Sequence, residues 1–167
     1  MKIVVTSDSH GDVLSLKNAL QEQADAYFHC GDSERNYDDP TLQSMYRVKG
    51  NCDFDNHFPE EVIVTIHDKR ILMVHGHLHN VKNNLMSLFY EGKEQQAQIV
   101  LFGHSHLFGA EMQEGILFVN PGSTLLPRGG NPATYAVIEW NQEVTVTFKT
   151  IAGEEVAQTT FTVNEAK

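Results

Sequence analysis

Five short apolar runs along the chain end beside a glycine and an aspartate, asparagine or histidine, and this repeated ending restricts the fold more than any other feature. In open α/β sheets, ligands bind beyond the carboxyl ends of the strands. Polar side chains that follow five such strands are therefore predicted to meet at one edge of the fold. The five endings are Ser7-Asp8-Ser9-His10-Gly11, Gly31-Asp32, Gly50-Asn51, His75-Gly76-His77 and Gly103-His104-Ser105-His106.

The spacing of apolar residues predicts a β-α-β opening followed by a strand-rich remainder. Helical spacing predicts helices over residues 12–23, with Asp12 near the N-cap, and over residues 80–96. Two β-rich runs around Asp68-Lys69 predict a hairpin, and the β-α-β opening indicates a parallel sheet. The predicted strands cover residues 2–7, 26–29, 46–49, 62–67, 70–75, 99–102, 116–120, 134–140, 144–151 and 156–163.

Length and charge limit the class of protein. A chain of 167 residues fits one domain over residues 1–167. Its formal net charge of −10 makes stable binding to nucleic acid or to an anionic membrane surface unexpected. Cys30 and Cys52 do not make a disulfide framework, and we see no targeting segment or membrane-spanning run. We therefore expect a cytoplasmic protein.

Two pairs of candidate metal ligands are each separated by one residue: Asp8 with His10, and His104 with His106. If these segments are extended, residues i and i+2 point to the same side and can reach one ion. Asp32 has two carboxylate oxygens and could bridge two ions. Carboxylates and imidazoles without a thiolate favour borderline to hard divalent cations.

Taken together, these motifs resemble the signature of the calcineurin-like metallophosphoesterase superfamily, and most closely its small bacterial and archaeal phosphodiesterase branch. The resemblance covers residues 1–139 and implies a four-layer α-β-β-α sandwich of two mixed β-sheets flanked by helices. The motifs that carry it are Asp8-x-His10, Gly31-Asp32, Gly50-Asn51-Cys52-Asp53, His75-Gly76, Gly103-His104-x-His106 and Asn120-Pro121-Gly122-Ser123.

The resemblance also implies a dinuclear metal centre. Mn²⁺ is the favoured ion, with Ni²⁺, Zn²⁺ and Fe as alternatives. A hydroxide that bridges the two ions would attack a small phosphate ester without a covalent enzyme intermediate. By the family's pattern, Asp8, His10 and His106 would hold one ion, Asn51, His75 and His104 would hold the other, and Asp32 would bridge them.

The third motif departs from the pattern of larger family members, which have a histidine after Asn51 that can protonate the leaving group. Here Cys52 follows, and a thiol with an ordinary pKa of about 8.5 is a weak replacement. Cys52, Asp53 and His77 are the candidate catalytic residues. His29 is interpreted as a buried imidazole behind the ligands.

The resulting prediction is a phosphodiesterase acting on a small phosphate ester. One alternative is a phosphomonoesterase or nucleotidase with the same centre. Another is a non-catalytic protein-binding scaffold, as in the retromer subunit that shares this architecture. The filled ligand positions favour an enzyme over a scaffold. A homodimer is left open beside a monomer.

Overall fold

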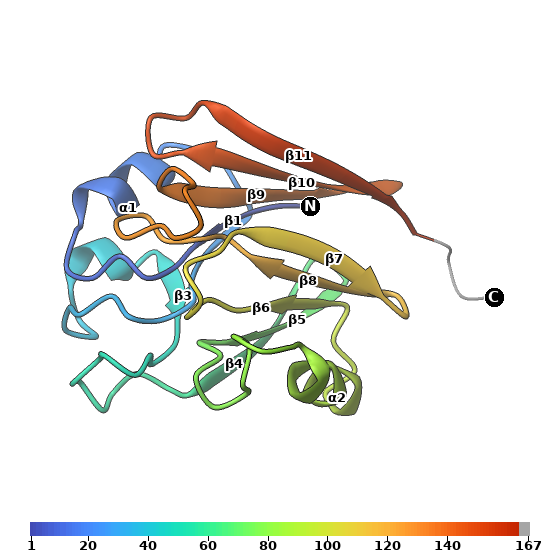
Figure 1. Ribbon diagram of the computed structural model, residues 1–167, viewed down its shortest axis with the longest axis horizontal. Helices are drawn as coiled ribbons and strands as arrows, with labels where there is room; N and C mark the ends of the chain where they lie inside the picture. Colours follow the sequence, from blue (N-terminus) through green and yellow to red (C-terminus); the bar gives the residue numbers. More distant parts are fainter. Residues whose placement is uncertain (164–167) are drawn as a thin grey trace.

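The computed structural model describes residues 1–163, so the last four residues of the predicted 1–167 domain lie outside the described part. Two mixed β-sheets face each other across a shared core (Figure 1). The first sheet has the order β11-β10-β9-β1-β2-β3. Its strands are β1 (Lys2–Thr6), β2 (Ala26–His29), β3 (Met45–Arg47), β9 (Thr134–Trp140), β10 (Glu143–Thr150) and β11 (Glu155–Thr162).

The second sheet has the order β4-β5-β6-β8-β7. In each sheet three neighbouring strands run parallel, β1-β2-β3 in the first and β5-β6-β8 in the second, and antiparallel strands flank them. The strands of the second sheet are β4 (Glu61–Ile66), β5 (Lys69–Val74), β6 (Ile99–Leu101), β7 (Gly109–Gln113) and β8 (Ile116–Asn120).

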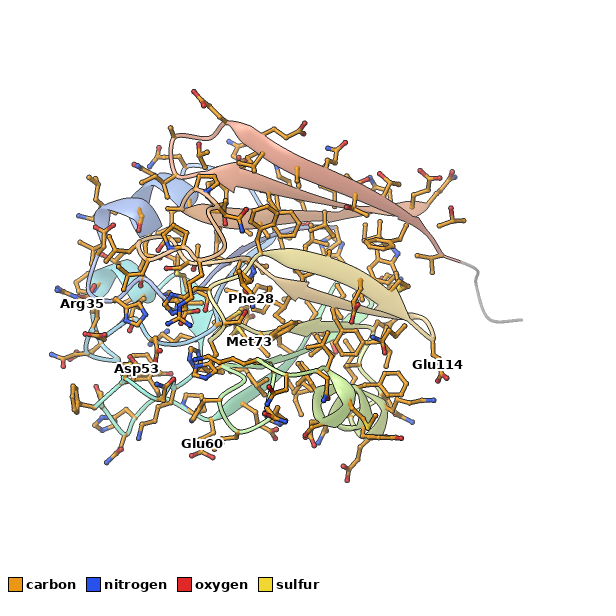
Figure 2. All side chains as sticks on the ribbon, in the orientation of Figure 1. Phe28, Arg35, Asp53, Glu60, Met73 and Glu114 are labelled. Atoms are coloured by element: carbon orange, nitrogen blue, oxygen red, sulfur yellow. The ribbon has the colours of Figure 1, made fainter. Side chains whose placement is uncertain are left out.

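Alternation along the strands separates the core between the sheets from the two outer faces. Ile3 of β1 and Met73 of β5 are buried between the sheets together with Phe28 of β2 (Figure 2). Their neighbours Val4 and Leu72 belong to clusters on the outer faces. Both central strands are therefore apolar on both sides, which explains why they read as continuous apolar runs.

One short α-helix covers the outer face of each sheet. Ala19 of α1 (Leu14–Ala19) packs against Val4, and Leu88 of α2 (Met86–Glu94) packs against Leu72. The layers thus follow the order helix, sheet, sheet, helix, and the predicted α-β-β-α sandwich is confirmed. Neither helix is long and apolar enough to cross a bilayer.

The helix predicted over residues 12–23 is longer than α1, the helix found there. The observed helix begins after Val13, and Asp12 accepts a hydrogen bond from the backbone N–H of Leu14 at 3.1 Å. It ends at Ala19, because the backbone N–H of Gln21 donates to the carbonyl oxygen of Asn18, only three residues earlier. The apolar spacing continued past this point because the following turn also packs against the sheet.

The second predicted helix begins too early. Asn80 has a left-handed backbone with φ +55°, which starts a turn rather than a helix. The side chain of Asn84 then accepts from the backbone N–H of Met86 at 3.0 Å, where the helix begins. At the other end, Gln96 has φ +55°, the conformation that commonly terminates a helix.

The predicted strands are found, with shifts of one or two residues at their ends, and the hairpin is present as β4 and β5. Two elements were missed. One is β7, an edge strand that joins β8 through a turn at Glu114 and Gly115, both with positive φ. The other is the single 3₁₀ turn η1 (Pro40–Leu42).

Candidate metal centre

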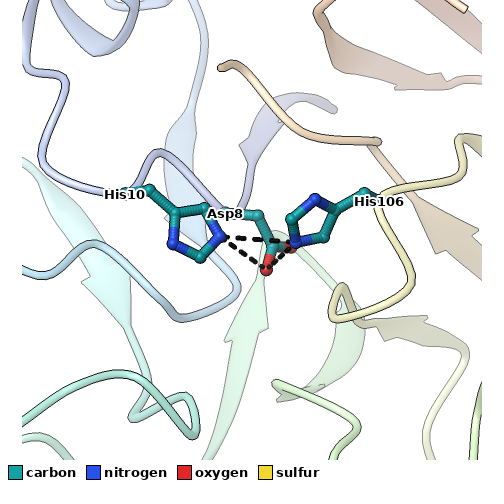
Figure 3. Close-up of side chains that lie close together, drawn as sticks. All are labelled: Asp8, His10 and His106. Atoms are coloured by element: carbon teal, nitrogen blue, oxygen red, sulfur yellow. Dashed lines mark hydrogen bonds and ion pairs between the residues drawn. The ribbon is translucent and has the colours of Figure 1, made fainter. Parts of the chain in front are cut away.

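The parallel strands of both sheets end on one side of the molecule, and their polar endings converge there (Figure 1). One cluster joins Asp8 and His10, which follow β1, to His106, which follows β6 (Figure 3). Nε2 of His106 lies 3.2 Å from Oδ1 of Asp8, and Nε2 of His10 lies 3.9 Å from the same oxygen. The two Nε2 atoms are 3.3 Å apart.

A second cluster joins Asp32, which follows β2, to His75 and His104 of the other sheet. Nε2 of His75 lies 3.2 Å from Oδ2 of Asp32 and 3.0 Å from Oδ1 of Asn51. The same nitrogen is 3.8 Å from Oδ1 of Asp8, so the two clusters are adjacent. Each cluster takes side chains from both sheets, and all seven candidate ligands come together.

The hydrogen-bond pattern fits a cation between these groups. Nδ1 of His75 bonds the carbonyl oxygen of Cys30 at 2.8 Å, and Nδ1 of His106 bonds that of Leu126 at 2.6 Å. Carbonyl oxygens only accept, so each Nδ1 is the donor and each Nε2 presents a lone pair to a carboxylate. Oδ1 of Asp8 is buried without a hydrogen-bond partner. Facing acceptors of this kind require a proton or a metal ion between them.

The pKa shifts reflect the same crowding of acceptors. Close contact with the Asp8 carboxylate raises the pKa of His106. Burial lowers the pKa of His75, but contact with the Asp32 carboxylate and the charge of Asp8 outweigh it, so the net shift is upward. His104 differs, because burial and the nearby His75 lower its pKa to about 4 and keep it neutral. A divalent cation could replace the protons of the first two imidazoles.

Five of the seven candidate ligands have a left-handed backbone, which is uncommon for residues other than glycine. The extended geometry expected for the two i, i+2 pairs is therefore wrong: sharp loops turn the side chains inward instead. Such backbone strain clusters at functional sites. The values of φ are 54° for Asp8, 45° for His10, 58° for Asp32, 73° for His104 and 61° for His106.

Asp53, a candidate catalytic residue, ties two ligand loops together. Its carboxylate accepts from the backbone N–H of Asp32 at 2.9 Å, of Glu34 at 2.9 Å and of Gly50 at 2.7 Å. Burial raises the pKa of Asp53, although these three bonds oppose the shift. The carboxylate is thus engaged in fixing the backbone around Asp32 and Asn51.

The other two catalytic candidates lie beside the second cluster. The His77 ring centroid is 5.4 Å from that of His75, and its Nδ1 is buried without a hydrogen-bond partner. Burial and the nearby His75 lower the pKa of His77. The backbone N–H of Cys52 donates to Oδ1 of Asp32 at 2.8 Å, and burial and that carboxylate raise the thiol pKa to about 11.

His29 lies behind the ligand loops and contacts no candidate ligand side chain by hydrogen bond. Its Nδ1 accepts from the backbone N–H of Gly31 at 3.1 Å, which leaves Nε2 to donate to Oγ of Ser9 at 2.8 Å. Complete burial lowers the pKa of His29 to about 4, so it is neutral. It joins the loops that carry Asp8 and Asp32.

Sequence reasoning missed several residues that hold the ligands. Oε1 of Glu34 lies 2.7 Å from Nδ1 of His10. Oγ of Ser7 donates to Oδ2 of Asp8 at 2.6 Å. Oγ of Ser123 donates to the backbone carbonyl oxygen of Asp8 at 2.7 Å. The two serines stand inside the quoted motifs, which could have marked them. Glu34 carries no such signal beyond its position two residues after Asp32.

Residues 1–143 match the calcineurin-like phosphoesterase superfamily domain. The curated protein Probable metallophosphoesterase YsnB from Bacillus subtilis is 39% identical over 160 residues, which cover 93% of this chain and 95% of that protein. Phosphodiesterase YfcE from Escherichia coli is 34% identical over 139 residues, which cover 77% of this chain and 69% of that protein. The matched range of residues 1–143 includes all seven candidate ligands.

Solved structures agree on the fold. A conserved uncharacterized protein from Streptococcus pneumoniae, described as a predicted phosphoesterase, has a TM-score of 0.92 at 36% identity, with 96% of each chain covered. Vacuolar Protein Sorting 29 from Cryptosporidium parvum has a TM-score of 0.79 at 19% identity, with 96% of this chain and 97% of that chain covered. At that identity the second likeness concerns the fold alone.

Proposed function

Because the chain belongs to the calcineurin-like phosphoesterase superfamily, we propose that it is a phosphodiesterase that hydrolyses small phosphate esters at a dinuclear metal centre. The observation that carries this proposal is the pair of adjacent clusters, in which Oδ1 of Asp8 and Nε2 of His75 are 3.8 Å apart. Ligand sets that approach each other this closely can hold a pair of ions, the arrangement that suits phosphoester hydrolysis.

The proposed roles follow the two clusters. Bound there, divalent cations, with Mn²⁺ as the favoured ion, would act as Lewis acids on the phosphoryl oxygens and lower the pKa of a water molecule. Asp32, which lies with His75 and His104, would supply negative charge to both ions, as the family's pattern implies. Asp8, His10 and His106 are assigned to the first ion, and Asn51, His75 and His104 to the second, with Asp32 shared.

The surrounding side chains favour esters whose alcohol leaves readily. With a pKa of about 11, Cys52 keeps its proton and is a weak acid toward a departing alkoxide. Asp53 is occupied by three backbone donors. His77 is the remaining candidate for contact with the substrate, because its imidazole lies beside His75 and lines a cavity next to the second cluster. A weakly assisted leaving group should therefore limit the rate on alkyl esters.

The choice of diester over monoester rests on likeness rather than on the centre itself. The Escherichia coli relative is named a phosphodiesterase, whereas a phosphomonoesterase could use the same ligands. We further propose a cytoplasmic protein, in keeping with the free thiols of Cys30 and Cys52. We also propose that the substrate is a small molecule and that the protein forms no stable complex with nucleic acid or membrane. A homodimer is an alternative to a monomer.

A substrate panel on metal-stripped protein tests the proposal. Mn²⁺, Ni²⁺, Zn²⁺ and Fe²⁺ are added back singly, and hydrolysis of bis-4-nitrophenyl phosphate is compared with that of 4-nitrophenyl phosphate. We expect the higher kcat/KM on the diester, and His104→Ala serves as the variant that should lose activity. A higher value on the monoester favours the phosphomonoesterase alternative. Hydrolysis of neither ester with any ion contradicts an enzymatic role and favours the scaffold.

A further inference from the structure

A polar cavity of about 320 Å³ opens beside the second ligand cluster. Two of its lining residues are part of the metal centre's surroundings. Asn51 places its amide oxygen 3.0 Å from Nε2 of His75, and the ring of His77 is tilted against the same imidazole with the centroids 5.4 Å apart. A group in this cavity is therefore next to a phosphate held at the centre. The lining residues are Lys49, Gly50, Asn51, Asp53, Glu60 and His77.

The wall of this cavity carries hydrogen-bonding groups and no apolar side chain. Glu60 is exposed, and it lies close enough to His77 for its charge to act on that imidazole. Lys49 donates to Oδ1 of Asn56 at 2.7 Å and has further N–H donors to offer. The cavity thus presents a carboxylate acceptor, an ammonium donor and the imidazole of His77.

An apolar ester group would have a different place to bind, but that place is separate from the ligands. A groove of about 780 Å³ runs between α2 and β7 and is lined by aromatic and aliphatic side chains such as Phe89 and Leu107. Of the loop that carries His104 and His106, only Ser105 lines the groove. None of the seven candidate ligands lines it. The centre is therefore flanked by the polar cavity rather than by the groove.

We propose that the polar cavity binds one ester group of the substrate and that this group is a polyhydroxylated alcohol, such as glycerol or a single sugar. The inference rests on the proposed phosphodiesterase function. Glu60 accepts hydrogen bonds from neighbouring hydroxyls, and Lys49 donates to a hydroxyl oxygen. An alkyl group would displace water from both charges without replacing its hydrogen bonds. The volume lies at the low end for small-molecule sites, which suits one sugar unit.

Two diesters with the same leaving group test this inference on the metal-loaded protein: 4-nitrophenyl glyceryl phosphate and 4-nitrophenyl propyl phosphate. We expect kcat/KM to be at least about tenfold higher for the glyceryl ester, from hydrogen bonds to a charged group. Glu60→Gln should bring the ratio of the two values close to one. Glu61→Gln is the matched control, because Glu61 is an exposed neighbour outside the cavity lining.

Equal kcat/KM values for the two esters would overturn the inference, as would an unchanged ratio in Glu60→Gln. If neither ester is hydrolysed, the proposed function fails, and calorimetry then decides on the cavity separately. In that case glycerol 3-phosphate and propyl phosphate are titrated into the metal-loaded protein. Tighter binding of glycerol 3-phosphate that Glu60→Gln abolishes supports the cavity, and equal affinities reject it.

Discussion

Oε1 of Glu34 lies 2.7 Å from Nδ1 of His10, while Nε2 of the same imidazole faces Oδ1 of Asp8 at 3.9 Å. A carboxylate on the far nitrogen fixes the tautomer and orientation of a metal-binding histidine. Glu34 is itself fixed, because its backbone N–H donates to Asp53 at 2.9 Å. Glu34 therefore belongs to the candidate centre although it touches no other proposed ligand.

Replacing Glu34 should weaken the binding of one ion and leave the binding of the other unchanged. We expect Glu34→Ala to lower the affinity for the ion at Asp8 and His10 by about 10- to 100-fold. Glu34→Gln keeps an acceptor and should lose less. Competition with a chromophoric chelator measures both stepwise affinities, with Glu155→Ala as an exposed control far along the chain. An equal loss at both ions, or none at either, would contradict this role.

Asp32→Asn should harm the centre more than Asn51→Ala. Asp32 is the residue assigned to both ions, and its charge offsets the repulsion between two dications, which is large even at an effective dielectric of about 20. We expect Asp32→Asn to bind at most one ion tightly and to lose most of kcat, with the fold retained. Asn51→Ala should be partly rescued by added metal. Two tight ions and near wild-type turnover in Asp32→Asn would show that Asp32 is not the bridge.

Metal removal should lower both activity and thermal stability. The ligands come from loops of two sheets and are assembled only in the folded chain, so metal binds the native state and stabilises it. At a free metal concentration about 100 times Kd, the gain is about 2.7 kcal/mol. Differential scanning calorimetry before and after chelation and desalting measures the change. An unaltered Tm together with unaltered hydrolysis would defeat the metal-centre proposal.

Apparent metal affinity should fall with acidity. Burial lowers the pKa of His75, but carboxylate contacts outweigh it, and contact with Asp8 raises the pKa of His106, so both imidazoles hold their protons to a higher pH than an ordinary histidine. Metal must displace these protons, which costs about tenfold in affinity per pH unit below each pKa. His104, with a pKa of about 4, does not compete in this range.

The same protons set the sign of the stability change. Raised pKa values stabilise the metal-free protein below pH 6.5, and that contribution is lost as the pH rises through the folded-state values. The bound metal contributes in the opposite sense. Chelation should therefore lower Tm more at about pH 8 than at about pH 6. A larger decrease in Tm at the lower pH would show that the protons in question are not on His75 and His106.

Gly103→Ala should damage the centre although every proposed ligand is kept. A Cβ at this position would lie 2.6 Å from Oδ2 of Asp8 and would overlap Oγ of Ser7. Forced crowding in a packed site costs about 1–3 kcal/mol, so Tm and metal affinity should both fall. Gly109→Ala is the matched control, because its Cβ would meet nothing within 4 Å. A Gly103→Ala protein with wild-type metal affinity would contradict the close approach.

The convergence of the strand ends was predictable because glycine beside a metal-type side chain marks each sharp exit from a buried strand. The backbone geometry at those exits was not, since alternation assumes an extended chain and Asp8 and His10 both have positive φ. Glu34 was invisible for another reason: its partner His10 is 24 residues away, and the contact exists only after β1 and β2 pair.

Local interactions explain why the predicted helix ends were wrong and why the edge strand β7 was missed. Val81 fits the apolar spacing of the predicted second helix, yet it lies in a turn where it packs on the same cluster as Leu88. Side-chain amides at Asn80 and Asn84 favour that turn over helix. The strand β7 contains glycine and glutamate, and it forms because β8 offers a free edge for pairing.

The core between the sheets also acts as a spacer for the chemistry. Asp8 and His106 stand on opposite sheets, and so do Asp32 and His75, so the thickness of the layer around Phe28 and Met73 sets the separation of each pair. An error of about 1 Å in such alignment can cost about a hundredfold in rate. Exchanges of methionine or phenylalanine deep in this layer are therefore expected to change the distances between candidate ligands of the two sheets, although these side chains do not belong to the centre.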